Sequence, residues 1–562
     1  MSVPNFSDIE YVRPDLEAFE ELIKSVRLKL MTATSLDQAM DAISEFEDAQ
    51  SRFDTAYALC TVKHDLDTSD EFFVKENDFF DENTARVSEL CSAVLTAILT
   101  CPCADEIRSK YGDMIFRKAQ NHKETISKEI LDELASEASL ESEYSQLQSE
   151  AQIDFDGRTL NLSLIQPYLE SDSRQVRKEA YKALDEYYMG RKPVYDRIYD
   201  DMVKVRTAAA RKLGYNTFTE LGYKRMERYD YTRDDVEKFR ESILKYIVPL
   251  TVQIRKLQQS RLGVDKLMFY DLGCLFRNGN PTPKVSKDTY KDAAGLYFRR
   301  MFGKDPSFFD VLSEHGFTDL ISRPNKSTGG YCMYLEDYGI PFIFMNGNGT
   351  YDDVATVVHE GGHAYAAIQS ADSSPFLECL SPTLETCEIH STAMEYMSYP
   401  YMDIFYGDNA SSYCQMHMTD GLLFLPYGCM VDEFQHIVYD DPDMPPEKRH
   451  MVWKELEEKY QPFINYDDET FHAMGGAWMK KDHIFTSPFY YIDYCLSQIC
   501  ALELWRESRL DMQSALHKYN TLCQAGGNDT FLNLIRNSGI ASPFDRDTIK
   551  TVAYECCKFL EL

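Results

Sequence analysis

Apolar residues recur at spacings of three and four along most of the chain, and this period predicts amphipathic helices. Charged residues fill the intervening positions, which leaves one apolar stripe on each helix. No period of about 30 to 45 residues repeats, so a solenoid is not expected. The helical pattern extends over residues 14–60, 70–100, 104–150 and from 173 to about 259. The chain is therefore predicted to be mainly α.

Two short stretches predict strands instead. Residues 155–169 alternate apolar and polar side chains after an Asp-Gly pair, which is typical of a hairpin. Residues 328–353 are rich in tyrosine, phenylalanine and glycine, and we expect strands at about 331–336 and 341–346. Pro341 cannot donate to a central ladder, so the second strand is predicted to lie at a sheet edge.

Charge and composition narrow the class of partner. The 562 residues carry a formal net charge of -33, which argues against nucleic acid or an anionic membrane as the main partner. The fifteen cysteines show no framework spacing, so we interpret them as reduced thiols. The N-terminus has no basic and apolar signal, and the longest nearly apolar stretch, 90–103, is too short to cross a bilayer. These features predict a cytoplasmic protein.

The chemistry concentrates in a predicted helix after the second strand. His359 and His363 are four residues apart, so both imidazoles project from one helical face and can reach one metal ion. Glu360 follows the first histidine directly. A carboxylate there can take a proton from a metal-bound water, so Glu360 is the predicted general base. The alternative is an ordinary helix with two solvated histidines. A third ligand would favour the metal site over this alternative.

A second predicted helix, 385–397, supplies candidates for that ligand. Glu385, Glu388, Ser391 and Glu395 share one face by their spacing. Carboxylates on one face repel, and a divalent cation would offset that repulsion. Glu388 lies 25 residues after His363, enough for one helix, a turn and a return. The predicted site is one Zn²⁺ per chain on two histidines and one glutamate, with the fourth position open, as in catalytic sites.

The stretches HEGGHAYAA and CEIHSTAMEYM together resemble the oligoendopeptidase F branch of the thimet-oligopeptidase-like zinc peptidases. Further matching stretches run from about residue 150 to 500. The resemblance implies His359, His363 and Glu388 as zinc ligands and Glu360 as general base, and we expect Ser391 and Glu395 to orient them. The pair Gly361-Gly362 departs from the family, which often has one glycine there. Two helical glycines cost about 1 kcal/mol each, and we interpret them as room for substrate or a neighbouring helix.

The resemblance also implies residues that contact substrate. In the segment HIFTSPFYYIDY, His483 would lie in the substrate cleft, and one of Tyr490, Tyr491 and Tyr494 would contact the substrate carbonyl. An aromatic core helix is the alternative for this segment. Peptidases of this kind hold substrate as an added strand, and we place it along the predicted edge strand, at Ile340, Pro341, Phe342, Ile343, Phe344 and Met345.

The fold implied by the resemblance is a large, two-lobed helical body around a deep substrate channel, with a small sheet next to the HExxH helix. We divide the chain into a helical N-terminal region (1–150), a helical middle region with the hairpin that forms part of the channel wall (151–328), and a catalytic zinc region (329–562). Such a channel would admit short unfolded peptides.

Two other functions remain open. The first is a helical metal-binding scaffold without peptidase activity, which the presence of Glu360 disfavours. The second is a zinc hydrolase that acts on folded proteins or on other amides. The sequence leaves the oligomeric state open between a monomer and a small homo-oligomer.

Overall fold

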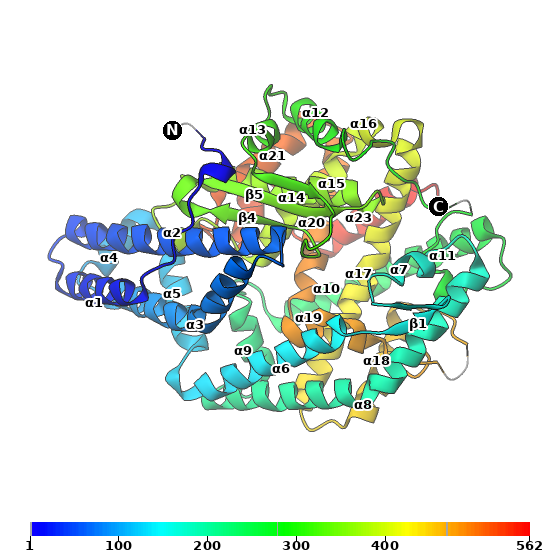
Figure 1. Ribbon diagram of the computed structural model, residues 1–562, viewed down its shortest axis with the longest axis horizontal. Coiled ribbons are helices and arrows are strands. Elements are labelled where there is room, and N and C mark those ends of the chain that lie inside the picture. The colour runs from blue at the N-terminus through cyan, green and yellow to red at the C-terminus, as the bar shows by residue number, and fades with distance from the viewer. Residues whose placement is uncertain (1–2, 278, 468–469) are drawn as a thin grey trace. The chain divides into compact units, whose positions relative to one another are not determined.

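The computed structural model describes residues 3–277, 279–467 and 470–562, and it confirms a mainly helical protein with small sheets (Figure 1). Side-chain caps define several helix starts. Asp15 accepts from the backbone N–H groups of the first turn of α1, and Ser35 and Asp70 do the same for α2 and α3, which satisfies donors that have no partner inside the helix.

The chain forms two compact units, and each is assembled from three separate segments. Unit 1 contains residues 1–126, 281–414 and 500–542, and unit 2 contains 127–280, 415–499 and 543–562. The three linear regions expected from the sequence do not coincide with these units, because helical periodicity carries no information about which distant segments pack together. The deep substrate channel stays a prediction.

Unit 1 holds a three-stranded sheet and, among the described residues, twelve complete α-helices. The strands are β3 (Thr318–Ile321), β4 (Tyr331–Leu335) and β5 (Ile340–Gly347). The helices are α1 (Leu16–Thr32), α2 (Leu36–Leu66), α3 (Glu71–Thr100), α4 (Ala104–Tyr111), α5 (Met114–Thr125), α12 (Tyr290–Phe302), α13 (Phe308–Glu314), α14 (Asp352–Ser370), α15 (Leu384–Met397), α16 (Asp403–Tyr406) and α21 (Met512–Ala525), followed by the short α22 (Phe531–Asn537).

The sheet of unit 1 has the order β3-β5-β4, with β5 parallel to β3 and antiparallel to β4. The prediction that the strand of Pro341 is an edge strand is therefore wrong. The β3 ladder meets β5 only from Ile343 onward, so the missing N–H of Pro341 leaves no gap in that ladder. The substrate position assigned to Ile340–Met345 loses its basis, because both neighbours of β5 are already strands.

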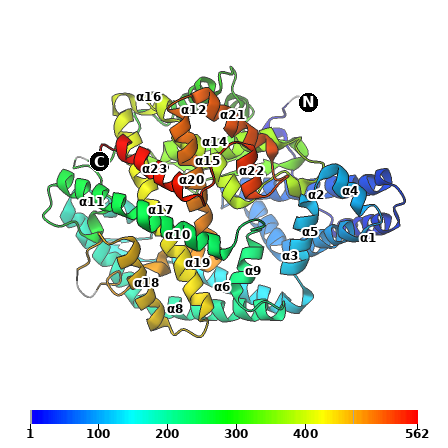
Figure 2. The same cartoon turned by 180° about the vertical axis from the view of Figure 1, so that it is seen from behind.

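Both faces of β5 are covered. Phe342 packs on Phe6, with ring centroids 4.7 Å apart, and Phe344 stacks on Tyr331 of β4. Helix α14 packs against β5 and β4, and α15 and α21 pack in turn against α14 (Figures 1 and 2). Helix α2 contacts β4 through the hydrogen bond from Tyr331 to Asp65. The sheet thus fixes the start of the helix that carries the candidate metal ligands.

In its described residues, unit 2 is helical apart from the hairpin β1 (Ile153–Phe155) and β2 (Arg158–Leu160). A hairpin was predicted here over residues 155–169, but it lies at 153–160, and residues 166–169 form a helix instead. Its helices are α6 (Leu131–Ser149), α7 (Gln166–Leu169), α8 (Arg174–Lys212), α9 (Phe218–Arg225), α10 (Arg233–Tyr246), α11 (Val248–Leu262), α18 (Pro446–Tyr460), α19 (Asp482–Thr486) and α23 (Arg546–Phe559). Two long helices, α17 (Ala410–Asp440) and α20 (Tyr491–Ser508), contain residues of both units.

Of the helices in the described residues, none taken singly has the length and apolar composition to cross a bilayer. One bent pair, α3 with α4, meets those two criteria jointly, and its axes differ by 95°. The cytoplasmic location stays a prediction.

Candidate metal and catalytic site

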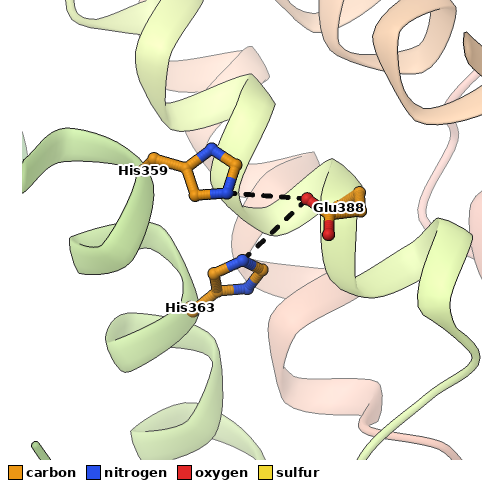
Figure 3. A group of neighbouring side chains, drawn as sticks. All are labelled: His359, His363 and Glu388. Carbon is orange, nitrogen blue, oxygen red and sulfur yellow. Dashed lines mark ion pairs between the residues drawn. The ribbon is translucent and has the colours of Figure 1, made fainter. Parts of the chain in front are cut away.

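Three side chains of unit 1 converge as the sequence predicted. His359 and His363 project from α14 toward Glu388 on the facing helix α15 (Figure 3). Glu388 Oε2 lies 3.6 Å from His359 Nε2 and 4.0 Å from His363 Nε2, and the three ligand atoms all lie within 4.8 Å of one another. Donors about 2.0–2.1 Å from one tetrahedral ion would be separated by roughly 3.3 Å. The set therefore fits a zinc ion after small side-chain adjustments.

Glu395 orients the first histidine. Its Oε1 lies 2.6 Å from His359 Nδ1, and this hydrogen bond fixes the tautomer in which Nδ1 carries the proton and Nε2 offers its lone pair toward Glu388. Ser391 plays a similar part for the carboxylate, because its hydroxyl donates to Glu388 Oε2 at 3.1 Å. Both residues were predicted as orienting groups on the face of α15.

The electrostatics of the site favour a positive charge. Burial disfavours the imidazolium of His359, but the hydrogen bond and charge of Glu395, together with Glu388 and Glu360, outweigh it and raise the pKa of His359 to about 10. Burial lowers the pKa of His363, and the charge of His359 adds to the effect. A positive charge beside these carboxylates is therefore favoured, whereas His363 is neutral and its imidazole can bind a metal ion.

Glu360 lies beside β4. An ideal Cβ placed on Gly330, just before β4, would lie 3.7 Å from Glu360 Oε1 and 3.0 Å from Thr356 Cγ2. Burial raises the pKa of Glu360 to about 7, opposed by the charge of His359 and reinforced by Glu388. A carboxylate with that pKa can both take and return a proton near neutral pH. Because residue 330 is glycine, no side chain of this position lies against the carboxylate.

The predicted aromatic residues form a second group, in unit 2. The His483 ring on α19 lies 5.0 Å from the Tyr491 ring, 5.8 Å from Tyr490 and 5.9 Å from Tyr494. His483, Tyr490 and Tyr494 are partly exposed, whereas Tyr491 is buried and packs on Phe424. Tyr491 is therefore a packing residue, whereas His483, Tyr490 and Tyr494 are accessible enough to contact a ligand.

One support of this aromatic group was missed from the sequence. Arg228 and Asp493 form a fully buried ion pair, with Arg228 Nη2 2.8 Å from Asp493 Oδ1. The same guanidinium donates to the carbonyl of Phe489, so it holds the turn from which α20 begins. A lone aspartate in the otherwise apolar and aromatic YYIDYCL was the available signal, because a buried charge requires a partner.

Family models and solved structures resemble the chain over most of its length. The model of Peptidase family M3 matches residues 167–554, and that of the Peptidase M3 N-terminal domain matches 6–126. Oligopeptidase PepF of Bacillus subtilis (strain 168) is 22% identical over 570 residues, which cover 95% of this chain and 82% of that protein. A solved PZ peptidase A with an inhibitor is 38% identical, with a TM-score of 0.92 over 99% of both chains.

A more distant solved structure, oligoendopeptidase-F from Enterococcus faecium, has a TM-score of 0.63 at 17% identity over 97% of each chain, which supports the fold alone. The family match spans more than half of the residues and includes α14 and α15. As the resemblance predicted, the chain belongs to peptidase family M3 and is a metallopeptidase.

Proposed function

We propose that the chain is a zinc-dependent oligoendopeptidase that hydrolyses internal bonds of short, unfolded peptides. The observation that carries the proposal is the position of Glu360, which adjoins the His359, His363 and Glu388 set and also faces the start of β4. The name of the Bacillus subtilis relative, an oligopeptidase, supports short peptides as substrates.

The residues present would hold one zinc ion through His359 Nε2, His363 Nε2 and Glu388 Oε2. A zinc ion there would act as a Lewis acid, lowering the pKa of a water ligand to about 7 and polarising the scissile carbonyl. Glu360 takes the proton of the attacking water and delivers it to the leaving amine nitrogen, so one carboxylate serves as base and then as acid. The hydrogen bonds between His359 and Glu395 and between Ser391 and Glu388 hold these two ligand side chains in their orientations.

Substrate would bind along β4. Among the residues that the structure describes, no strand pairs with the edge of β4 opposite β5. An extended peptide added there uses main-chain hydrogen bonds, which read no particular sequence. It would also pass Gly330, next to Glu360. The proposed substrate position is thus the free edge of β4, and it replaces the position along β5 that was expected from the sequence. His483, Tyr490 and Tyr494 stay the candidates for donors to the oxyanion.

The test is cleavage of a mixed pool of short peptides, read by mass spectrometry, beside Glu360→Gln and a folded protein substrate. The zinc-loaded wild type should cut peptides and spare the folded protein, and the variant should bind zinc equally and lose activity by about 10²–10⁴-fold. If zinc-loaded wild type leaves every peptide intact, the scaffold function replaces the proposal. Digestion of the folded protein would favour the hydrolase of intact proteins.

A further inference from the structure

The backbone of Phe489 adopts a conformation that aromatic residues rarely take. Its φ is 67°, in the left-handed region that favours glycine, asparagine and aspartate. The Tyr490 N–H donates to the Ser487 carbonyl at 3.2 Å, so Phe489 takes the third position of a turn of type II, where glycine is usual. In the described part of the chain, the other non-glycine residues with a positive φ are all polar, namely Asp156, Glu227, Asn325 and Glu561. A phenylalanine in this conformation must be held there by its surroundings.

Two buried side chains hold the backbone N–H and carbonyl groups of Phe489. Gln435 Oε1 accepts from the Phe489 N–H at 2.9 Å, and Arg228 Nη2 donates to the Phe489 carbonyl at 2.5 Å. The amide nitrogen of Gln435 donates to the Val431 carbonyl at 3.3 Å, which leaves the amide oxygen for Phe489. Asp493 accepts from the guanidinium of Arg228 at 2.8 Å. Both backbone groups are therefore bound to side chains that are themselves held by hydrogen bonds.

The ring of Phe489 is packed between α9 and α17. It is fully buried, and its centroid lies 5.7 Å from that of Tyr223 on α9 and 5.0 Å from that of His436 on α17. A Cβ at position 222 of α9 would lie 2.6 Å from Phe489 Cδ2, so Gly222 provides the room that this ring occupies. Phe489 is thus anchored at its N–H, at its carbonyl and at its ring.

The tyrosines that the proposed function needs begin directly after this anchored residue. The Tyr490 carbonyl accepts from the Asp493 N–H at 2.9 Å, in the first turn of α20. The Tyr494 ring lies 4.8 Å from the Tyr490 ring, and both residues are partly exposed. A rotation about φ of Phe489 would turn Tyr490 and redirect the start of α20. Strained residues of this kind cluster at functional sites, where the strain pre-organises the groups that follow.

We propose that Phe489 is a positioning residue of the peptidase, and that Gln435 and Arg228 hold it in the left-handed conformation that orients Tyr490 and Tyr494. The inference rests on the proposed function, which makes these tyrosines candidate donors to the oxyanion. It gives α17, which supplies none of the metal ligands, a part in the reaction through the amide of Gln435.

Gln435→Leu tests the inference, because it removes the acceptor of the Phe489 N–H and keeps a buried side chain of similar size. In the zinc-loaded full chain, kcat on one defined peptide should fall at least about tenfold, since small misplacements of reacting groups are costly. KM should change less than about threefold, and the zinc content should stay the same. An unchanged kcat overturns the inference.

The matched control is Gln258→Leu. Gln258 is also a buried glutamine of unit 2, but it donates to the carbonyls of Asp271 and Cys274. Its replacement leaves buried backbone groups without a partner and should destabilise the fold to a similar extent, while kcat changes less than about twofold. An equal loss of kcat in Gln258→Leu and Gln435→Leu would mean that the effect is only structural, and it overturns the inference.

A second measurement asks whether Gln435 acts through the tyrosines. In a chain that carries both Tyr490→Phe and Tyr494→Phe, adding Gln435→Leu should lower kcat less than about twofold, because the hydroxyls that it helps to orient are gone. The full tenfold loss in that chain overturns the inference.

Crystal structures of the wild type and of Gln435→Leu distinguish a failure of this inference from a failure of the proposed function. In the variant, Phe489 should leave the left-handed region and Tyr490 should move by about 1 Å or more. If both stay in place, the inference is overturned even though the wild type cleaves peptides. A wild type that cleaves no peptide refutes the proposed function instead. If Gln435→Leu does not fold, Gly222→Ala displaces the Phe489 ring and replaces it in each experiment.

Discussion

Gly362 of α14 lies directly against the backbone of His390 on α15. A Cβ at position 362 would be 2.5 Å from the His390 carbonyl oxygen and 2.8 Å from Ser391 Cα. Both distances are too short for a Cβ atom, so only glycine fits at this position. The second glycine of HEGGH thus allows a close helix–helix approach, one of the two uses expected from the sequence. Gly361 has a different neighbour, the ring of Phe298, whose Cζ would lie 2.2 Å from a Cβ.

Gly362→Ala should therefore lower the free energy of unfolding by about 1–3 kcal/mol, because backbone atoms of α15 cannot move aside as a side chain can. Separation of the two helices would also move Glu388 away from the histidines and weaken zinc binding. Chemical denaturation and zinc titration measure the two effects. Gly190→Ala on α8 is the control, since nothing lies within 4 Å of its Cβ position, and it should stabilise by up to about 1 kcal/mol. Equal behaviour of the two variants would contradict the packing argument.

Glu395→Gln should reduce zinc affinity by about 10–100-fold while the fold is retained. The amide cannot hold His359 Nδ1–H as strongly as the carboxylate that lies 2.6 Å away. Activity should return when excess zinc is supplied, because Glu360 is unchanged. Competition with a fluorescent zinc chelator measures the affinity. Glu314→Gln, an exposed residue at the end of α13, controls for the loss of one negative charge. An unchanged affinity would show that Glu395 has no orienting role.

Zinc affinity should fall as the pH falls. The raised pKa of His359, about 10 in the metal-free site, means that below this pH a proton occupies the imidazole and zinc must displace it. Each unit of pH between about 9 and 6 should therefore lower the apparent affinity about tenfold. His363, whose pKa is lowered, adds no proton in this range. Zinc titration at several pH values tests the slope, and a flat profile would mean that His359 is not a ligand.

Phenylalanine substitutions should show which of Tyr490, Tyr491 and Tyr494 takes part in catalysis. If Tyr490 or Tyr494 donates to the oxyanion, its replacement should lower kcat by about 10²–10³-fold without loss of zinc. Tyr491→Phe should change kcat less than about threefold, because Tyr491 is buried against Phe424. Steady-state kinetics on one defined peptide, with zinc content measured in parallel, decides among them. A large effect of Tyr491→Phe alone would reverse the assignment.

The metal set and the helical class followed from the sequence because each depends on local spacing. His359 and His363 share a face by helical geometry alone, and the regular spacing on α15 placed Ser391 and Glu395 with Glu388. The position of β5 did not follow, because strand order depends on pairing with β3, which the chain near Pro341 does not encode. Nor could the spacing separate buried Tyr491 from its neighbours, since their burial depends on distant helices.

The segmented composition of unit 1 bears on when the peptidase becomes complete during synthesis. Helices α14 and α15 pack on α21, where Tyr519 donates to the His390 carbonyl and Tyr365 donates to Asn520. These contacts span 129 and 155 residues. When the HEGGH segment of α14 has been synthesised, helix α21, which packs against α14 and α15, has not yet been made. Helices α14 and α15 can therefore reach their final packing only after α21 has been synthesised. This long-range step is slow compared with local helix formation, so most of the chain has left the ribosome before the active site is complete.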